Sequence, residues 1–190
     1  IVGSAAHAAV IDPSVSPDVY RELASRHGWS IRYVLETHVH ADHLSRAREL
    51  ARQTGATLLL PPQQRVTFAF TALGDGERVS VGHATLTAAH TPGHTNESTS
   101  FVLNEDAVFT GDTLFTNGVG RPDLHADPDA ARQRARALFA SLARLRTLPA
   151  HTVVLPAHAS EPIAFDGRAV AADMSEIATS ETVTTQELEG

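Results

Sequence analysis

Apolar and polar positions follow two different periods along the first sixty residues. Three short apolar runs have the length and composition of strands, at residues 7–11, 31–36 and 56–60. Ser16 followed by Pro17 predicts the start of a helix, and Gly28 predicts its end. Residues 44–54 carry leucine and alanine at helical spacing, and Gly55 predicts a C-cap there. Strands and helices therefore alternate in this part of the chain.

The remaining residues predict hairpins, one long helix and a final strand. Four runs pair across short turns, 79–81 with 84–89 and 99–103 with 107–110. Asp127 and Pro128 predict the start of the long helix. Its apolar stripe consists of Ala131, Ala135, Leu138, Phe139, Leu142 and Leu145. Residues 152–155 predict the last strand, whereas residues 65–70 fit either a strand or a loop.

This order of elements predicts a layered α/β (α+β) fold. Alternating strands and helices followed by hairpins favour packed sheets with helices outside over a purely parallel, doubly wound sheet. A length of 190 residues suits one domain with a large core. We expect residues 1–165 to form that domain and residues 166–190 to form a C-terminal extension or tail.

Composition narrows the classes of function. The net charge is −7 and no lysine occurs, which argues against a nucleic-acid partner. No apolar run approaches the roughly 20 residues of a membrane span, so we expect no membrane partner. No secretory signal pattern opens the chain, which favours a cytoplasmic location, although the start at Ile1 leaves a removed leader open. The absence of cysteine excludes thiolate ligands within this sequence.

The eleven histidines are the feature of the composition that indicates chemistry. Four segments matter, each directly after a predicted strand or at a hairpin end: 37–43 (THVHADH), 90–95 (HTPGHT), 110–115 (TGDTLF) and 156–158 (PAH). If the strands lie side by side, their ends converge on one cleft, a common arrangement of binding sites. The segments supply seven candidate ligands: His38, His40, Asp42, His43, His94, Asp112 and His158.

The first segment has a spacing suited to a metal site. In an extended stretch His38 and His40 point to the same side, and Asp42 and His43 follow as the chain turns. Imidazole suits zinc, iron, copper or nickel, and carboxylate adds a harder oxygen ligand. Asp112 could bridge two ions or complete a three-ligand face. A lone His-x-His pair is more often accidental, but the complete set in this order favours a metal site.

The four segments resemble the metallo-β-lactamase superfamily, and the likeness runs in the same order from about residue 7 to residue 158. The resemblance implies an αββα sandwich, with two mixed sheets flanked by helices. It also implies that the chain lacks a first strand before His7. Because this fold hosts many reactions, the motifs are more specific for the superfamily than for the activity.

Residues 111–115 followed by 118–121 (GVGR) look most like the persulfide dioxygenase and glyoxalase II branch. Residues 120–124 (GRPDL) are similar to the variant in persulfide dioxygenase-like proteins, including those fused to rhodanese domains. In that family the residues matching His38, His94 and Asp112 hold one Fe(II). Two histidines and one carboxylate leave positions open for oxygen and substrate.

The hydrolase branch implies two zinc ions in place of one iron. One ion would be held by His38, His40 and His94. The other would be held by Asp42, His43 and His158, with Asp112 bridging the two. Glyoxalase II also carries a helical C-terminal domain that binds glutathione, whereas this sequence ends at residue 190, which disfavours that enzyme.

The leading hypothesis is oxidation of glutathione persulfide, or a related thiol persulfide, by O2 at a mononuclear iron. Asp42, His43 and His158 would then be catalytic groups that orient water or shuttle protons. Arg121 is either a contact for a substrate carboxylate or a structural partner of Asp123. The alternative is hydrolysis of a thioester or related ester at a zinc pair, as in glyoxalase II.

The expected partner is a small thiol-derived molecule, and a homodimer and a rhodanese partner are compatible with the resemblance. β-Lactamase activity is disfavoured because a cysteine ligand common in those enzymes is impossible here, and Asp112 takes its site. A non-catalytic binding module is disfavoured by the intact set of seven candidate ligands.

Overall fold

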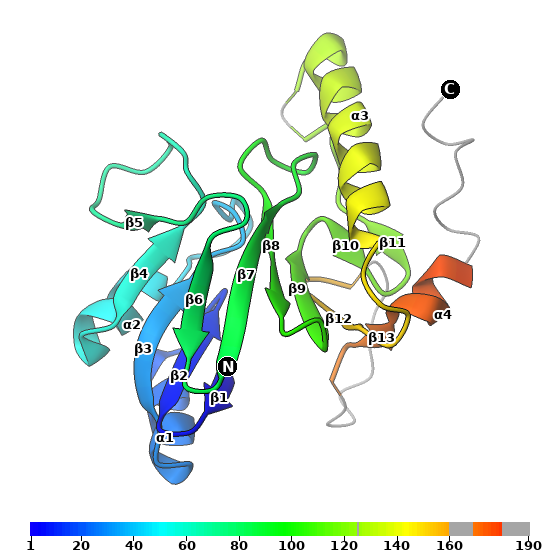
Figure 1. The fold of residues 1–190 in the computed structure, drawn as a ribbon. Coiled ribbons are helices and arrows are strands. Elements are labelled where there is room, and N and C mark those ends of the chain that lie inside the picture. Colours follow the sequence, from blue (N-terminus) through cyan, green and yellow to red (C-terminus); the bar gives the residue numbers. More distant parts are fainter. Residues whose placement is uncertain (125, 160–168, 180–190) are drawn as a thin grey trace.

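The computed structural model describes residues 1–124, 126–159 and 169–179. Two β-sheets stack face to face, and helices cover their outer sides (Figure 1). The first sheet has the strand order β1 (Val2–Ser4), β2 (His7–Ile11), β3 (Ser30–Leu35), β4 (Thr57–Leu60) and β5 (Thr71–Ala72). Its outer face packs against α1 (Pro17–Arg26) and α2 (Ala47–Thr54).

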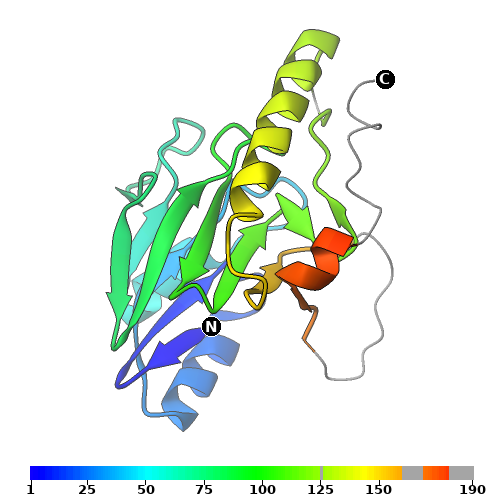
Figure 2. The same cartoon turned by 45° about the vertical axis from the view of Figure 1, so that its right-hand side comes forward.

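The second sheet has the strand order β13 (Ala172–Asp173), β12 (Val153–Pro156), β9 (Ala107–Gly111), β8 (Thr99–Leu103), β7 (Ala84–His90) and β6 (Arg78–Val81). Its outer side is covered by α3 (Pro128–Leu145) and α4 (Met174–Thr179) (Figure 2). A two-stranded ribbon of β10 (Leu114–Phe115) and β11 (Gly118–Val119) lies nearby. Each sheet mixes strand directions. In the first, β1 is antiparallel to β2 while β2, β3 and β4 are parallel; in the second, β12 is parallel to β9 while β6 to β9 are antiparallel.

Three apolar layers hold these sheets and helices together. The central layer lies between the sheets and joins Leu35 and Leu59 of the first sheet to Leu86 and Phe101 of the second. Burying a side chain as large as Phe101, which is 1% exposed, contributes about 1.5–3 kcal/mol. The two outer layers lie under α1 and α2 on one side and under α3 and α4 on the other. The predicted αββα sandwich with two mixed sheets is therefore confirmed.

Most predicted elements form close to their predicted bounds, but α2 begins later than expected. It starts at Ala47 rather than at Leu44, and Leu44 is 74% exposed. The oxygen Ser45 Oγ accepts from Ala47 N–H (3.0 Å), and its hydroxyl donates to Glu36 Oε1. These contacts keep the preceding residues as a loop beside the first sheet. Residues 65–70, which fitted a strand or a loop, are a loop.

The buried face of α3 differs from its predicted apolar stripe at one position. Leu138, Leu142 and Leu145 are buried, whereas Phe139 is 46% exposed, so its place in that stripe was wrong. The N-terminal half of α3 extends past the sheets, and only its last turns cover the second sheet (Figure 2). None of the helices in the described residues combines the length and the apolar composition that a membrane span requires.

Short elements near both ends of the chain were not predicted. β1 precedes His7 and pairs antiparallel with β2, so the expectation that no strand lies there was wrong. β13 pairs with β12, and Met174 and Ile177 are buried in the core beneath α4. Residues 172–177 therefore pack against the second sheet. The predicted boundary after residue 165 lies outside the described residues.

Substitution Gly111→Ala at the end of β9 is expected to destabilise the protein by about 3 kcal/mol. Gly111 has a φ of 53°, and a side chain in this left-handed region costs about 1–2 kcal/mol. An added Cβ would also press on Thr37, whose own Cβ would be 2.7 Å away. Such overpacking costs about 1–3 kcal/mol, and urea unfolding measures the total.

The matched control is Gly28→Ala, because Gly28 has a φ of 69° but no atom lies within 4 Å of the added Cβ. It should cost about 1 kcal/mol. Equal losses of stability in the two variants would contradict the role of the contact with Thr37.

Candidate metal centre

The ends of β3, β7, β9 and β12 bring the predicted ligands together. β12 is the parallel neighbour of β9, so Asp112 and His158, which follow these strands, lie side by side. The N–H of Thr99 at the start of β8 donates to Thr37 O (2.9 Å), which ties the loop after β3 to the second sheet. The cluster is therefore positioned by backbone pairing in both sheets.

His38, His94 and Asp112 form the first group of convergent ligand atoms. The Nε2 atoms of His38 and His94 lie 3.8 Å and 3.5 Å from Asp112 Oδ2. The opposite ring nitrogens contact the protein, since His94 Nδ1–H donates to Arg121 O (3.1 Å) and His38 Nδ1 lies 3.0 Å from Thr37 Oγ1. Each ring thus has one nitrogen held by the protein and the other turned toward Asp112. Histidines that bind metals are commonly held in this way.

His40 and His43 lie beside this group. The ring of His40 is 4.1 Å from that of His38 and 4.4 Å from that of His43, measured between centroids. Among the described residues, His40 Nδ1 and His43 Nε2 are buried and have no hydrogen-bond partner. Burying a polar atom without a partner is costly, so these two nitrogens are candidate ligands of a bound cation.

Two buried carboxyl groups contact the other side of His40. Its Nε2 lies 3.1 Å from both Asp12 Oδ1 and Glu36 Oε2. Burial alone would lower the pKa of His40, but Asp12 and Glu36 outweigh it and raise that pKa to about 10. Burial raises the pKa of Glu36 to about 7. Neither carboxyl group was predicted as part of the site, although Asp12 directly follows a predicted strand.

His158 connects the two sides of the cluster. Its Nδ1 lies 2.6 Å from Asp112 Oδ1, and its Nε2 lies 2.8 Å from Asp42 Oδ2. Burial would lower the pKa of His158, but these two carboxylates raise it. Burial would likewise raise the pKa of Asp42, yet its backbone hydrogen bond, His43 Nδ1 at 3.1 Å and the charge of His158 lower it to about 2. All seven predicted ligands therefore lie in one cluster.

The donor set of this cluster fits a metal cofactor. Three groups have ligand atoms within 4.8 Å of one another: His38, His94 and Asp112; His40, Asp42 and His43; and Asp12, Glu36 and His40. Histidine nitrogens with carboxylate oxygens suit both iron and zinc. The first group has the composition of the predicted iron triad. The second brings His40 together with Asp42 and His43, whereas the two-zinc assignment groups it with His38 and His94.

The segment after β11 closes one side of the cluster. A Cβ at Gly120 would collide with the backbone oxygen of Asp112 and lie 3.1 Å from His94 Cβ, so this close approach requires glycine. The Arg121 guanidinium donates to Asp123 Oδ1 from Nε (3.0 Å) and to Oδ2 from Nη2 (2.7 Å). Of the two roles predicted for Arg121, the structure contains the pair with Asp123.

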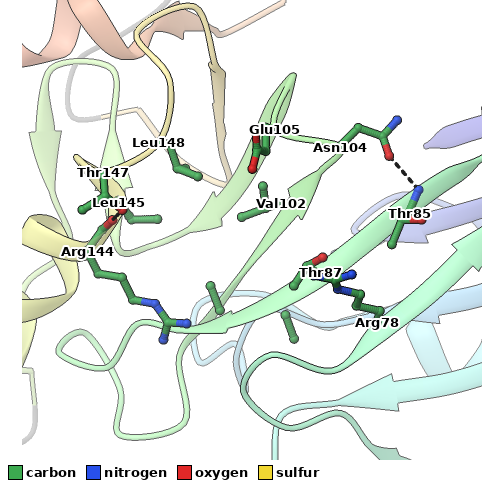
Figure 3. Close-up of a pocket in the computed structure, with 12 residues that line it drawn as sticks. Arg78, Thr85, Thr87, Val102, Asn104, Glu105, Arg144, Leu145, Thr147 and Leu148 are labelled. Carbon is green, nitrogen blue, oxygen red and sulfur yellow. Dashed lines mark hydrogen bonds between the residues drawn. The ribbon is translucent and has the colours of Figure 1, made fainter.

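Two cavities of about 410 Å³ adjoin the cluster. Another, of about 420 Å³, lies between the outer face of β6–β8 and the end of α3 (Figure 3). Arg78 and Arg144 line it, and Asn104 Oδ1 accepts from Thr85 N–H there (2.9 Å). None of the seven predicted ligands lines this distant cavity, so the candidate chemistry lies at the cluster instead.

Comparison with known sequences finds a family profile and curated relatives that match this chain. The sequence profile of the Metallo-beta-lactamase superfamily matches residues 1–158. Hydroxyacylglutathione hydrolase from Methylococcus capsulatus is 40% identical to this chain over 159 residues. The match covers 82% of this chain and 58% of that relative, so the chain spans less than two thirds of the relative's length.

Comparison with solved structures finds proteins of the same fold, one of them solved in a di-iron-bound form. ETHE1 from Myxococcus xanthus superposes with a TM-score of 0.78 and 32% identity, covering 94% of this chain and 75% of that one. TTHA1623 in a di-iron-bound form superposes with a TM-score of 0.68 and 29% identity, covering 90% of this chain and 86% of that one. These identities extend the likeness from the fold to the sequence.

Proposed function

The chain belongs to the metallo-β-lactamase superfamily, and from this premise we propose that it oxidises a thiol persulfide with O2 at one iron(II). The observation that carries the proposal is the convergence of two histidine Nε2 atoms on one carboxylate, in the group formed by His38, His94 and Asp112. Two histidines and one carboxylate are the ligands of mononuclear iron(II) oxygenases. The likeness to ETHE1 from Myxococcus xanthus supports this choice.

The expected substrate is glutathione persulfide or a related thiol persulfide. A bound iron(II) would supply the one-electron chemistry that O2 requires. His38 and His94 would hold it through Nε2, while Thr37 and the Arg121 carbonyl keep the rings in orientation. His158 lies between Asp112 and Asp42, where its two ring nitrogens can hold and pass a proton.

A second candidate function is hydrolysis of a thioester at a zinc pair. It is favoured by the nearby His40, Asp42 and His43 group and by the 40% identity to a hydroxyacylglutathione hydrolase. A zinc pair would lower the pKa of water to near 7 and polarise the thioester carbonyl. Asp112, whose two carboxylate oxygens face His38 and His158, would contribute a ligand oxygen to each side of the cluster.

Metal content and two activity assays test the proposal directly. The protein is purified without added metal or chelator, and its metals are measured by elemental mass spectrometry. About one iron per chain, with oxygen uptake on glutathione persulfide, would support the dioxygenase. About two zinc ions per chain, with hydrolysis of S-lactoylglutathione and no oxygen uptake, would overturn it in favour of the hydrolase.

Substitution His40→Ala is expected to separate the two functions. It should lower thioester hydrolysis by about a hundredfold if a metal pair is needed, but leave oxygen uptake within about tenfold of the wild type. The reason is that His40 lies outside the group formed by His38, His94 and Asp112. Steady-state rates in both assays measure the effect.

The paired variant is His43→Ala, since His43 is 27% exposed and its loss should be tolerated by the fold. The control is His83→Ala, an exposed histidine in the turn between β6 and β7. The mononuclear assignment would be contradicted if His40→Ala and His43→Ala each lost as much oxygen uptake as His38→Ala.

A further inference from the structure

One of the two cavities that adjoin the cluster, here called the rim pocket, has the properties of a substrate site. Its volume of about 410 Å³ falls within the range of small-molecule sites. The residues that line it include Val39, Asp42, Arg65, His94, Leu124 and Arg134. Asp42 and His94 place it directly against the metal cluster, so a molecule bound there can reach the cluster.

Two arginines from separate elements line the rim pocket, together with the carboxylates of Asp42 and Glu97. Arg65 comes from the loop between β4 and β5, and Arg134 comes from α3. Glu97 is held by contacts within the protein, since its Oε1 accepts from Arg65 Nη1 (2.7 Å) and from Val39 N–H (3.3 Å). Asp42 is likewise engaged with the histidines of the cluster. Two cationic groups lining one pocket are notable in a chain of net charge −7.

Each of the two guanidinium groups is held by a hydrogen bond from one nitrogen, whereas its other nitrogens have no partner among the described residues. Arg134 Nη1 donates to Leu124 O (3.0 Å), and Arg65 Nη1 donates to Glu97. Among the described residues, no partner is found for Nε or Nη2 of either arginine. A guanidinium has five N–H donors in a fixed plane, so each can still bind a carboxylate. Val39 and Leu124 supply apolar surface beside these charges.

We propose that the rim pocket binds the carboxylate-bearing part of the substrate, with Arg134 as the main specificity-determining contact and Arg65 as the second. This rests on the proposed function for the identity of the sulfur compound. The glutathione part, which carries two carboxylates, is common to glutathione persulfide and to S-acyl glutathione. The same pocket therefore serves either candidate reaction, with the sulfur directed toward His94.

Binding of S-methylglutathione tests the pocket without any turnover. Isothermal titration calorimetry on the purified protein is expected to show binding to the wild type, weakened about tenfold or more by Arg134→Met. Arg65→Met should also weaken binding, and Arg134→Lys should restore part of it because the charge returns. The matched control is Arg136→Met, an exposed arginine on the same helix that does not line the pocket, and it should bind within about twofold of the wild type.

The outcomes separate this inference from the proposed function. Unchanged affinity in Arg134→Met, or no binding to the wild type at millimolar concentration, overturns the pocket assignment. A matched loss in Arg136→Met also overturns it, since the effect would then be one of general charge. If Arg134→Met loses binding while the wild type shows neither oxygen uptake nor thioester hydrolysis, the pocket stands and the proposed function fails.

Discussion

Replacing Asp112 with alanine is expected to abolish metal binding and to lower turnover by about a thousandfold or more. One carboxylate oxygen of Asp112 faces the Nε2 atoms of His38 and His94, and the other contacts His158 Nδ1. Both candidate reactions use this carboxylate, as the third iron ligand or as the bridge between two zinc ions. Its loss also removes the negative charge that faces three histidines.

This effect is measured as the metal content after loading with iron or zinc, and as the rates of oxygen uptake and of thioester hydrolysis. Asp112→Asn keeps the shape of the side chain but not its charge, so it should lose metal as well. The control is Asp106→Ala, an exposed aspartate in the turn that precedes β9. Full metal occupancy in Asp112→Ala would contradict the assignment of Asp112 as a ligand, whatever its activity.

The candidate ligands could be predicted because each lies at the end of a strand with clear apolar character or in the loop that follows one. His38 follows β3, Asp112 follows β9 and His158 follows β12, and the parallel pairing of β9 with β12 brings the last two together. Asp12 follows β2 in the same way, but it lies outside the histidine-rich segments and was missed. Glu36 was assigned to a strand, where its burial against His40 is a tertiary contact that no local pattern reveals.

The elements that could not be predicted are short or depend on distant partners. β1, β10, β11 and β13 have two or three residues each, too few to show a period. Phe139 has helical spacing with the buried leucines of α3, but this part of the helix is not covered by the sheet and the ring is exposed. The choice of iron or zinc is also absent from the pattern, because histidine and aspartate bind both.

Removing the metal is expected to lower the thermal midpoint of unfolding by about 10 °C. An ion that binds the folded chain a thousandfold above its Kd adds about 4 kcal/mol of stability, and 1 kcal/mol shifts the midpoint by about 2–4 °C at this chain length. The ligands come from loops after β3 and β7 and from the ends of β9 and β12, so one ion would join both sheets. Its loss would leave the unpaired nitrogens of His40 and His43 buried without a partner.

Thermal unfolding followed by circular dichroism compares protein as purified, protein treated with chelator and dialysed, and protein reloaded with iron(II) or zinc. The midpoint should fall on chelation and return on reloading. In Asp112→Asn the chelator should have no effect, because that variant would hold no ion to lose. If elemental analysis shows that chelation removes the metal but the wild-type midpoint is unchanged, no ion stabilises the fold by linking the two sheets at this cluster.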